Sequence, residues 1–287
     1  MQAVLDLAGL PGALTTTVFV PQGTYRFDGM LRIPEGVTLC GASKSVPSHN
    51  GVRDCGLPHP MTSGTTFLVC SGADDENATP FLTLSSNATA KRICFYYPDQ
   101  NPDAEPTPYP WCIAMRGKNP AVLECELLNP YLGIDATHNE RHMIRNISGQ
   151  PLKTGIYIDA IYDIGRVENV HFNPWWCMNP KLMAWQMKNG VAFRFARTDW
   201  QYVLNTFCFG SRIDREMAFS EFSEKAFFCG FSAFFHAFSM FSAFQPVNKV
   251  TLHGHQNTHE VQLFLRPVFF GRNFCRNSAV SMVTAHL

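Results

Sequence analysis

The sequence predicts an all-β protein: a right-handed, single-stranded parallel β-helix that begins with a short capping helix. Three observations lead to this fold class. Short runs of β-branched and aromatic residues follow one another, separated by Gly, Pro, Asn or Asp. No long amphipathic helix is expected between the capping helix and residue 211, which excludes folds that alternate strands with helices. One segment also recurs about every 22 residues, the length of one solenoid coil.

The first elements can be assigned in chain order. Residues 2–7 form the opening helix, which Gly9 and Pro11 bring to an end. Six strand-like runs follow, each bounded by turn residues, at 16–27, 29–33, 36–41, 65–70, 79–84 and 92–98. Because helices are missing between these runs, sandwiches, barrels and solenoids are the remaining architectures.

An internal repeat favours the solenoid. The segments LECELLNP (123–130) and VENVHFNP (167–174) match in register, which aligns Leu123 with Val167 at an offset of 44. Ile144, in the similar segment IRNISG, divides this offset into steps of 21 and 23. Strands of a sandwich would not return to one register at that interval, whereas stacked coils do.

The same spacing aligns Asn146 with Asn169, 23 residues apart. Stacked asparagines at the corner of a coil can hydrogen-bond along the solenoid axis, which satisfies amides that would otherwise lack partners. We therefore expect these two residues to be structural.

The C-terminal part differs in composition. Fourteen of the 24 Phe follow residue 211, and the segment 226–244 has no charged residue and places Phe at helical spacing. It is interpreted as a capping helix, a membrane-spanning helix, or a segment foreign to the fold. The domains are thus predicted as a β-helix over residues 1–211 and a Phe-rich tail over 212–287.

The charge balance limits the expected binding partners, and the positions of the cysteines indicate their chemical state. The 23 basic and 23 acidic residues balance, so a nucleic acid is not an expected partner and a membrane is disfavoured. Most of the ten cysteines lie in apolar runs, which predicts buried thiols, with disulfides and then a metal site as alternatives. The sequence has no phosphate-binding Gly loop and no Gly-x-Ser-x-Gly motif.

The segment TTVFVPQGTYRFDGMLRIPEGVTLCG resembles the entry of the pectate-lyase-like superfamily, in the branch of rhamnogalacturonase-, exo-glucanase- and phage-tailspike-type β-helices. A second section, from YPWCIAMRG to DWQYVLNTFCFG, is similar to an uncharacterised bacterial subgroup. The resemblance covers residues 1–211 and implies a polysaccharide or oligosaccharide partner and an extracellular or cell-envelope location. The family's upstream strand and later coils are missing here, so the domain is expected to be incomplete at both ends. The N-terminus shows no secretory signal.

Candidate catalytic residues come from two segments with the same Ile-Asp-Ala context. Asp135 and Asp159 lie 24 residues apart, so we expect them on successive coils, about 5 Å from one another, with Asp163 slightly further along. Paired carboxylates of this kind, one protonated and one ionised, are what glycoside hydrolysis requires. The alternatives are that these residues cap turns or bind calcium.

A polysaccharide lyase is the alternative enzyme, because it needs a base and a cation beside a uronate. His142, Lys153 and Arg166 are the candidates for those roles, and Ca²⁺ is an option in a lyase, whereas a hydrolase is expected to need no cofactor. A non-catalytic glycan-binding or structural β-helix is the third hypothesis.

Residues 155–176 alternate apolar and polar side chains, which predicts one face in the core and one in solvent. Aromatic rings and ionisable groups on an outer face suit a sugar polymer. Of two adjacent tryptophans on a strand, at most one can face outward. The predicted sugar contacts are Trp175, Trp176, Tyr131, His171 and Glu168.

Overall fold

The computed structural model describes residues 1–42, 53, 55–57, 59, 61, 64–218, 226–229, 250–253 and 258–261. Within them the helices are α1 (Gln2–Ala8) and α3 (Pro180–Asn189). The strands of the first half are β1 (Thr17–Phe19), β2 (Gly23–Phe27), β3 (Leu31–Ile33), β4 (Thr38–Cys40), β5 (Thr65–Val69), β6 (Leu82–Leu84), β7 (Thr89–Lys91), β8 (Ile93–Tyr96), β9 (Trp111–Met115), β10 (Gly117–Lys118), β11 (Ala121–Leu123) and β12 (Glu126–Leu127). The later strands are β13 (Leu132–Thr137), β14 (Asn139–Glu140), β15 (Met143–Gly149), β16 (Thr154–Asp159), β17 (Ile161–Phe172), β18 (Val191–Phe195), β19 (Thr198–Cys208), β20 (Ile213–Ala218), β21 (Ala226–Cys229), β22 (Val250–His253) and β23 (Thr258–Val261).

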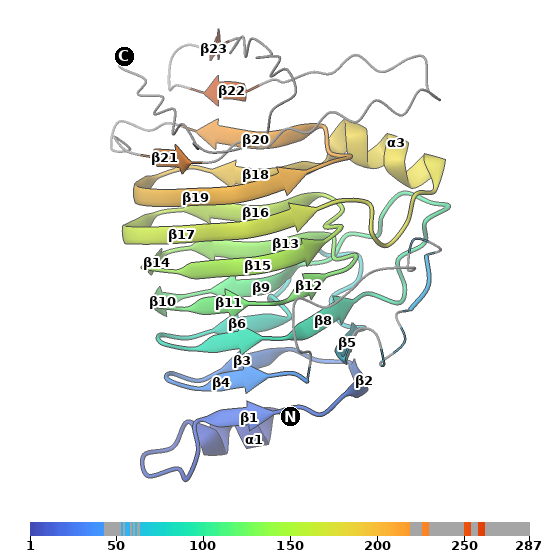
Figure 1. Ribbon diagram of the computed structural model, residues 1–287. Coiled ribbons are helices and arrows are strands. Elements are labelled where there is room, and N and C mark those ends of the chain that lie inside the picture. The colour runs from blue at the N-terminus through green and yellow to red at the C-terminus, as the bar shows by residue number, and fades with distance from the viewer. Residues whose placement is uncertain are drawn as a thin grey trace, which may run out of the picture.

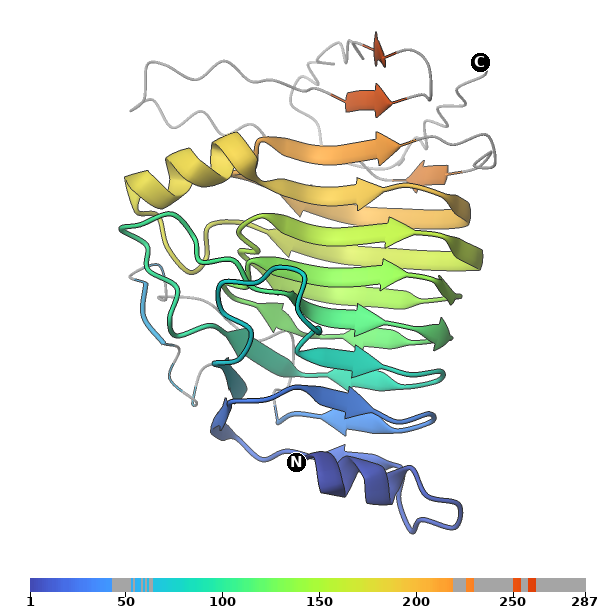
Figure 2. The ribbon, with the colours of Figure 1, turned by 180° about the vertical axis from the view of Figure 1, so that it is seen from behind.

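These strands form two large sheets of 14 and 9 strands. We call them the first and the second sheet. The strands of both sheets are stacked from the end that carries α1 to the end that carries β22 and β23, and turning the molecule shows the second sheet in front (Figures 1 and 2). The pairings among residues 17–218 are parallel, and β22 with β23 is antiparallel. The fold is therefore all-β, with large parallel sheets that curl strongly, and it is compatible with a β-helix.

Apolar residues at equivalent positions of successive strands build the core. In the first sheet, Val122 pairs with Ile144, Ile144 with Val167 and Val167 with Val203, and all four side chains are buried. The predicted step from Ile144 to Val167 is confirmed. The predicted partner Leu123 is wrong by one residue, because Leu123 pairs with Arg145. The true steps are 22 and 23 residues.

Left-handed backbone conformations at the corners explain the stacked asparagines. Asn146 and Asn169 have φ of 56° and 52°, which Asn tolerates better than most residues. The Nδ2 of Asn169 donates to the Oδ1 of Asn146 at 2.8 Å, so the predicted amide ladder is confirmed. At the same corner, Arg92 and Glu124 also have positive φ and form an ion pair at 2.6 Å.

Helix α3 lies between β17 and β18, where no helix was expected. The Oδ1 of Asn179 caps it by accepting from the backbone N–H of Lys181, and Pro180 occupies its first turn. Asn-Pro before a helix and Gly190 after it are recognisable start and stop signals. The segment was nevertheless missed because its apolar residues do not form a pronounced helical stripe. The opening helix was predicted over 2–7 and extends to Ala8.

The cysteines that the structure describes are six thiols and one disulfide-bonded pair. Cys40, Cys94, Cys112 and Cys125 are buried thiols, as predicted, whereas Cys70 and Cys208 are half-buried. Burial raises the pKa of Cys125 to about 12, which makes this thiol unreactive. Cys55 and Cys177 form a disulfide between residues 122 apart in the sequence.

The described residues of the predicted tail include the strands β20, β21, β22 and β23. β20 and β22 extend the second sheet, and β21 pairs with β19 of the first. β21 is extended where a helix was one of the options for 226–244; the rest of that segment lies outside the described residues. Within the described part of the chain, no helix is both long and apolar enough to cross a membrane.

Candidate functional site

One row of side chains crosses the outer face of the second sheet. The strand register aligns six residues that flank core positions, here called the outer row: Arg32, Thr83, Ala114, Asp135, Tyr157 and Arg194. Tyr157 lies between the buried Ile156 and Ile158, and this alternation turns its ring away from the core. With strands about 4.8 Å apart, the row from Arg32 to Tyr157 spans about 19 Å.

An aromatic pair lies at the middle of the outer row. The rings of Trp111 and Tyr157 are stacked, with centroids 6.2 Å apart and an interplanar angle of 19°. Tyr157 is in β16, and Trp111 begins β9 opposite Leu132 of the intervening strand β13, where it also packs against the hydrophobic core. The Arg194 guanidinium lies 5.5 Å from the centre of the Tyr157 ring on the other side.

Asp135 lies beneath this pair in β13 and is 6% exposed. The guanidinium of Arg116 forms an ion pair with its carboxylate and also donates to the backbone carbonyl of Thr137. The second carboxylate oxygen accepts from the backbone N–H of Thr137. Asp135 is therefore a shielded, fully paired anion, and a sugar on the surface would meet the aromatic rings before reaching it.

Asp159 ends strand β16 and accepts five hydrogen bonds. Arg197 donates to it from Nε, Nη2 and its backbone N–H, at 2.8, 2.8 and 3.0 Å. The Tyr157 hydroxyl and the Ala160 N–H donate at 3.2 and 2.8 Å. Burial by itself raises the pKa of Asp159, but the hydrogen bonds and charge of Arg197 outweigh it, and the net pKa lies below the usual value.

The two carboxylates are on adjacent strands but not at equivalent positions. Asp135 pairs with Tyr157, and Asp159 pairs with Thr137. The predicted alignment of the two aspartates is therefore wrong by two residues, because the coil is 22 residues long rather than 24. Apolar and polar side chains alternate on both strands, so shifting one strand by two residues against the other leaves the apolar side chains on the same face. The shared Ile-Asp-Ala context therefore did not fix the register. Their Cα atoms are about 8 Å apart rather than about 5 Å.

Asp163 lies at a different place in the molecule, at a corner with φ of 59°. Its Oδ2 accepts from Arg141 at 2.8 Å, and Arg141 in turn donates to Asn119, which donates to Asn87. The hydrogen bond from Arg141 lowers the pKa of Asp163. The structure thus places this residue in a corner ladder, which is the turn-capping alternative, away from Asp159.

His142, which directly precedes β15 of the first sheet, is completely buried. Its Nδ1 is 2.8 Å from the Oδ1 of Asn139, and a Cβ on Gly165 would lie within 2.7 Å of its Nε2. Burial lowers the pKa of His142 to about 3, so the imidazole is neutral near pH 7. A side chain enclosed in this way cannot reach a polymer on the surface.

The other basic candidates do not converge on His142. Lys153 forms an ion pair with Glu76 at 2.5 Å and lies 5.2 Å from the centre of the buried Tyr131 ring. Partial burial lowers its pKa, but Glu76 and Tyr131 outweigh this effect, so the net pKa is raised and Lys153 stays protonated. Arg166 is in β17 of the first sheet, bonded through its backbone N–H to the carbonyl of His142, whereas Lys153 directly precedes β16 of the second sheet.

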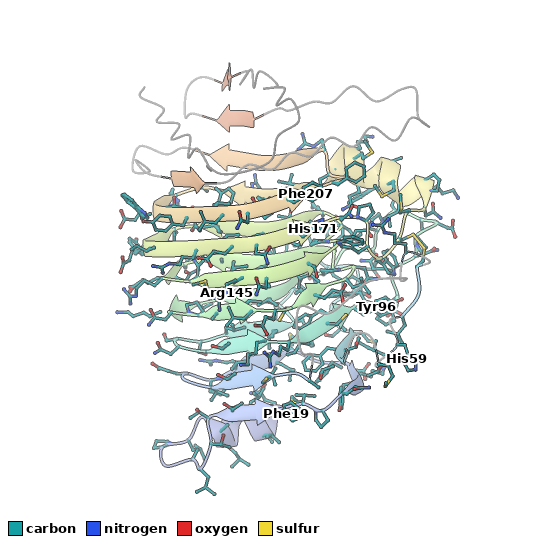
Figure 3. All side chains as sticks on the ribbon, viewed as in Figure 1. Phe19, His59, Tyr96, Arg145, His171 and Phe207 are labelled. Atoms are coloured by element: carbon teal, nitrogen blue, oxygen red, sulfur yellow. A yellow bond between two sulfur atoms is a disulfide. The ribbon has the colours of Figure 1, made fainter. Side chains whose placement is uncertain are left out.

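The expected sugar contacts divide between the core and the outer face of the first sheet. Trp176 is 1% exposed, in agreement with the expectation that one of the two tryptophans is internal. Trp175 is half-buried, with the Arg53 guanidinium 4.4 Å from its ring centre and His171 at 5.3 Å. His171 and Phe207 are paired on neighbouring strands and lie side by side (Figure 3). Glu168 is half-buried and lies in β17, the same strand as His171.

Trp111, Arg116, Tyr157 and Arg197 were not predicted as site residues. Tyr157 stands in the polar phase of the alternating segment 155–176, so the pattern contained a signal for it. The sequence contained no comparable signal for the arginines. Arg197, for example, is 38 residues from Asp159 in the sequence, and the two meet only because the chain returns to the neighbouring strand over that distance. The sequence-predicted aspartates of this sheet are thus present in the site, but as partners of unpredicted arginines.

The three candidate aspartates do not fit the Ca²⁺ alternative. Each is paired with an arginine, whose charge opposes a bound cation. In the described residues, no group of three His, Cys, Asp or Glu side chains is arranged to hold a metal ion.

Comparisons of the chain with protein-family models, with curated proteins and with solved structures found no match.

Proposed function

We propose that this chain is a glycan-binding protein with a right-handed, single-stranded parallel β-helix fold of the pectate-lyase-like type. Its proposed contact surface is the outer row with Trp111 beside it. The fold proposal is supported by parallel pairings that return after 21 and 22 residues through Ile113, Ile134 and Ile156. The binding proposal is carried by one observation: a stacked Trp–Tyr pair, flanked by charged groups, on the outer face of a sheet.

Aromatic rings and charged hydrogen-bonding groups are complementary to a saccharide. The apolar face of a sugar ring stacks on an aromatic ring, and its hydroxyls accept from arginine and donate to carboxylates. Asp159 and Arg197 hold each other in a fixed geometry, which reduces the entropy that the surface loses on binding. The disulfide Cys55–Cys177 supports a location outside the cytosol, because such bonds persist in oxidising compartments.

Inverting glycoside hydrolysis is the second candidate, and one observation favours it. Asp135 and Asp159 are on adjacent strands, offset by two residues in register, so their side chains lie on the same face of the second sheet, and hydrolysis requires two carboxyl groups on one face. The chemistry is less favourable than this placement. A general acid must hold its proton near neutral pH, whereas Arg197 lowers the pKa of Asp159 and Asp135 is shielded.

The lyase hypothesis has the least support. Its base would have to reach a uronate on the surface, but His142 is enclosed, Lys153 is held protonated by Glu76, and Arg166 lies on the other sheet. His142 is buried and Arg166 belongs to the first sheet, whereas Asp135 and Asp159 are in strands of the second sheet. Ordinary packing and ion pairing account for each of them.

Binding is tested with a panel of plant and microbial polysaccharides in affinity electrophoresis, followed by calorimetry on any ligand found. Tyr157→Ala should weaken binding about tenfold or more, because a stacking ring is lost. Tyr162→Ala is the matched control, since Tyr162 is exposed on β17, outside the outer row. Equal loss in both variants, or no loss in either, would contradict the proposed surface.

Turnover separates the candidates. The unmodified protein is incubated with each bound polysaccharide, and both new reducing ends and unsaturated uronides are measured. The binding proposal expects neither product. Reducing ends that disappear in Asp159→Asn, with binding retained, would replace it with the hydrolase; ultraviolet-absorbing uronides would replace it with the lyase.

A further inference from the structure

A cavity opens at the end of the outer row that lies nearest to α1. It has a volume of about 540 Å³, in the range of small-molecule sites. Its lining combines apolar residues with seven polar ones: Gln2, Arg32, Thr79, Thr83, Ser85, Ser86 and Arg116. No carboxylate lines this cavity within the described residues, although Arg116 reaches Asp135 at its margin.

Several of the polar groups that line the cavity can donate hydrogen bonds. The Oγ of Ser85 accepts from Nε of Arg32 at 3.2 Å, and the Oγ of Ser86 accepts from the backbone N–H of Lys118 at 3.1 Å. Each hydroxyl still has its own proton to donate and one further lone pair. The remaining guanidinium protons of Arg32 can only donate, so a ligand with acceptor oxygens is complementary to these side chains.

The cavity also carries one uncompensated positive charge. The charge of Arg116 is balanced by Asp135, whereas Arg32 forms no ion pair within the described part of the chain. Gln2 holds the backbone of Arg32 on both sides: its Oε1 accepts from the N–H at 2.8 Å and its Nε2 donates to the carbonyl at 3.0 Å. The same Nε2 is 2.7 Å from Asp6, whose carboxylate does not line the cavity.

We propose that this cavity, which we call the Arg32 cavity, binds an oxyanion: a carboxylate, sulfate or phosphate group. A group with several acceptor oxygens and negative charge meets the donors of Arg32, Ser85 and Ser86 together. The oxyanion is either a free ion or a charged substituent on a glycan that follows the outer row. The second source rests on the proposed function, because Thr83 and Ala114 connect the cavity to Asp135 and Tyr157 in strand register.

The first experiment is calorimetric titration of the full chain with sodium sulfate at constant ionic strength, with chloride as the reference salt. Saturable binding to one site is expected, and Arg32→Gln should weaken it about tenfold or more, since a charged hydrogen-bonding group is lost. Arg26→Gln removes the same charge from β2, where Arg26 pairs with the exposed Asp28, and should bind as the unmodified protein does. Absence of saturable binding, or equal binding by Arg32→Gln, would overturn the proposal.

The second experiment compares sulfated, uronate-containing and neutral oligosaccharides of equal length. Charged oligosaccharides that outcompete sulfate and lose affinity in both Arg32→Gln and Tyr157→Ala assign the oxyanion to a glycan. Sulfate binding without any oligosaccharide binding retains the cavity as a site for a free anion and rejects the glycan proposal. Neutral and charged oligosaccharides that bind equally, unaffected by Arg32→Gln, retain the glycan surface and reject the cavity.

Discussion

Asp159 and His142 are ionisable residues whose surroundings decide what they can do. Asp159 receives donors from Arg197, Tyr157 and Ala160, which favour its charged form. His142 receives no compensating charge and is enclosed by the core, which favours its neutral form. The first is therefore a fixed anion at the surface, and the second is a buried polar group whose protonation is linked to folding.

His142 predicts a specific dependence of stability on pH. Its pKa in the folded chain is about 3, below the ordinary value of 6.5, so between these values the unfolded chain binds the extra proton. The free energy of unfolding should therefore fall as the pH drops from about 6.5 toward 3, by up to about 1.4 kcal/mol per pH unit from this residue. Urea unfolding at pH 7, 6, 5 and 4 measures this slope.

In His142→Gln the slope over that interval should be smaller than in the unmodified protein, whatever the stability at pH 7. His138→Gln, at an exposed position, controls for the loss of one imidazole. An unchanged slope in His142→Gln would mean that the buried imidazole does not control acid sensitivity.

At the scale of the elements, adjacent strands approach so closely that some positions accept only glycine. Gly149 ends β15 and pairs with Leu127 of β12. Its φ is 142°, and an added Cβ would lie 1.9 Å from the carbonyl oxygen of Leu127. Such a contact is with backbone rather than with the end of a flexible side chain, so the two strands would have to separate.

Gly149→Ala should accordingly lower the free energy of unfolding by about 3 kcal/mol or more, measured by urea denaturation. Gly29→Ala is the matched control, because a Cβ there meets nothing within 4 Å. If the two alanine variants were equally stable, the close pairing of β12 with β15 would be incorrect.

At the scale of the whole molecule, the disulfide connects distant parts of the chain. Cys55 belongs to the connection between β4 and β5, and Cys177 lies three residues before the start of α3. The bond lies beside a small buried cluster that includes Leu152, Trp176 and Leu182, on the outer side of the first sheet. It fastens the early coils to the later ones outside the main core.

Reduction should destabilise the protein, because a cross-link over 122 residues restricts the unfolded chain. We expect a loss of about 2–4 kcal/mol in the free energy of unfolding when Cys55 and Cys177 are both replaced by Ser. Cys70→Ser, at a half-buried thiol, is the control. Peptide mapping without reductant should recover a linked pair containing Cys55 and Cys177; alkylation of both residues in the unreduced, unfolded chain would contradict the bond.

The sequence by itself determined the local features of this fold. Strand runs, the opening helix and the internal Trp176 follow from short-range patterns, and the step from Ile144 to Val167 and the Asn146–Asn169 ladder follow from the internal repeat. Such patterns are readable because β-branched runs, turn residues and alternation act over a few neighbouring residues.

Only the tertiary structure decided which charged residues of the candidate site meet between neighbouring strands. Side chains on a strand alternate with a period of two, so shifting one strand by two residues against its neighbour keeps the apolar side chains on the core face. The sequence pattern therefore could not distinguish the predicted pairing of Asp135 with Asp159 from the observed pairing of Asp135 with Tyr157. The number of residues between strands places Arg197 beside Asp159 and Arg116 beside Asp135. Both predicted catalytic acids therefore form ion pairs. Partners separated by a coil leave no local trace in the sequence, since their contact depends on the exact number of residues in each corner.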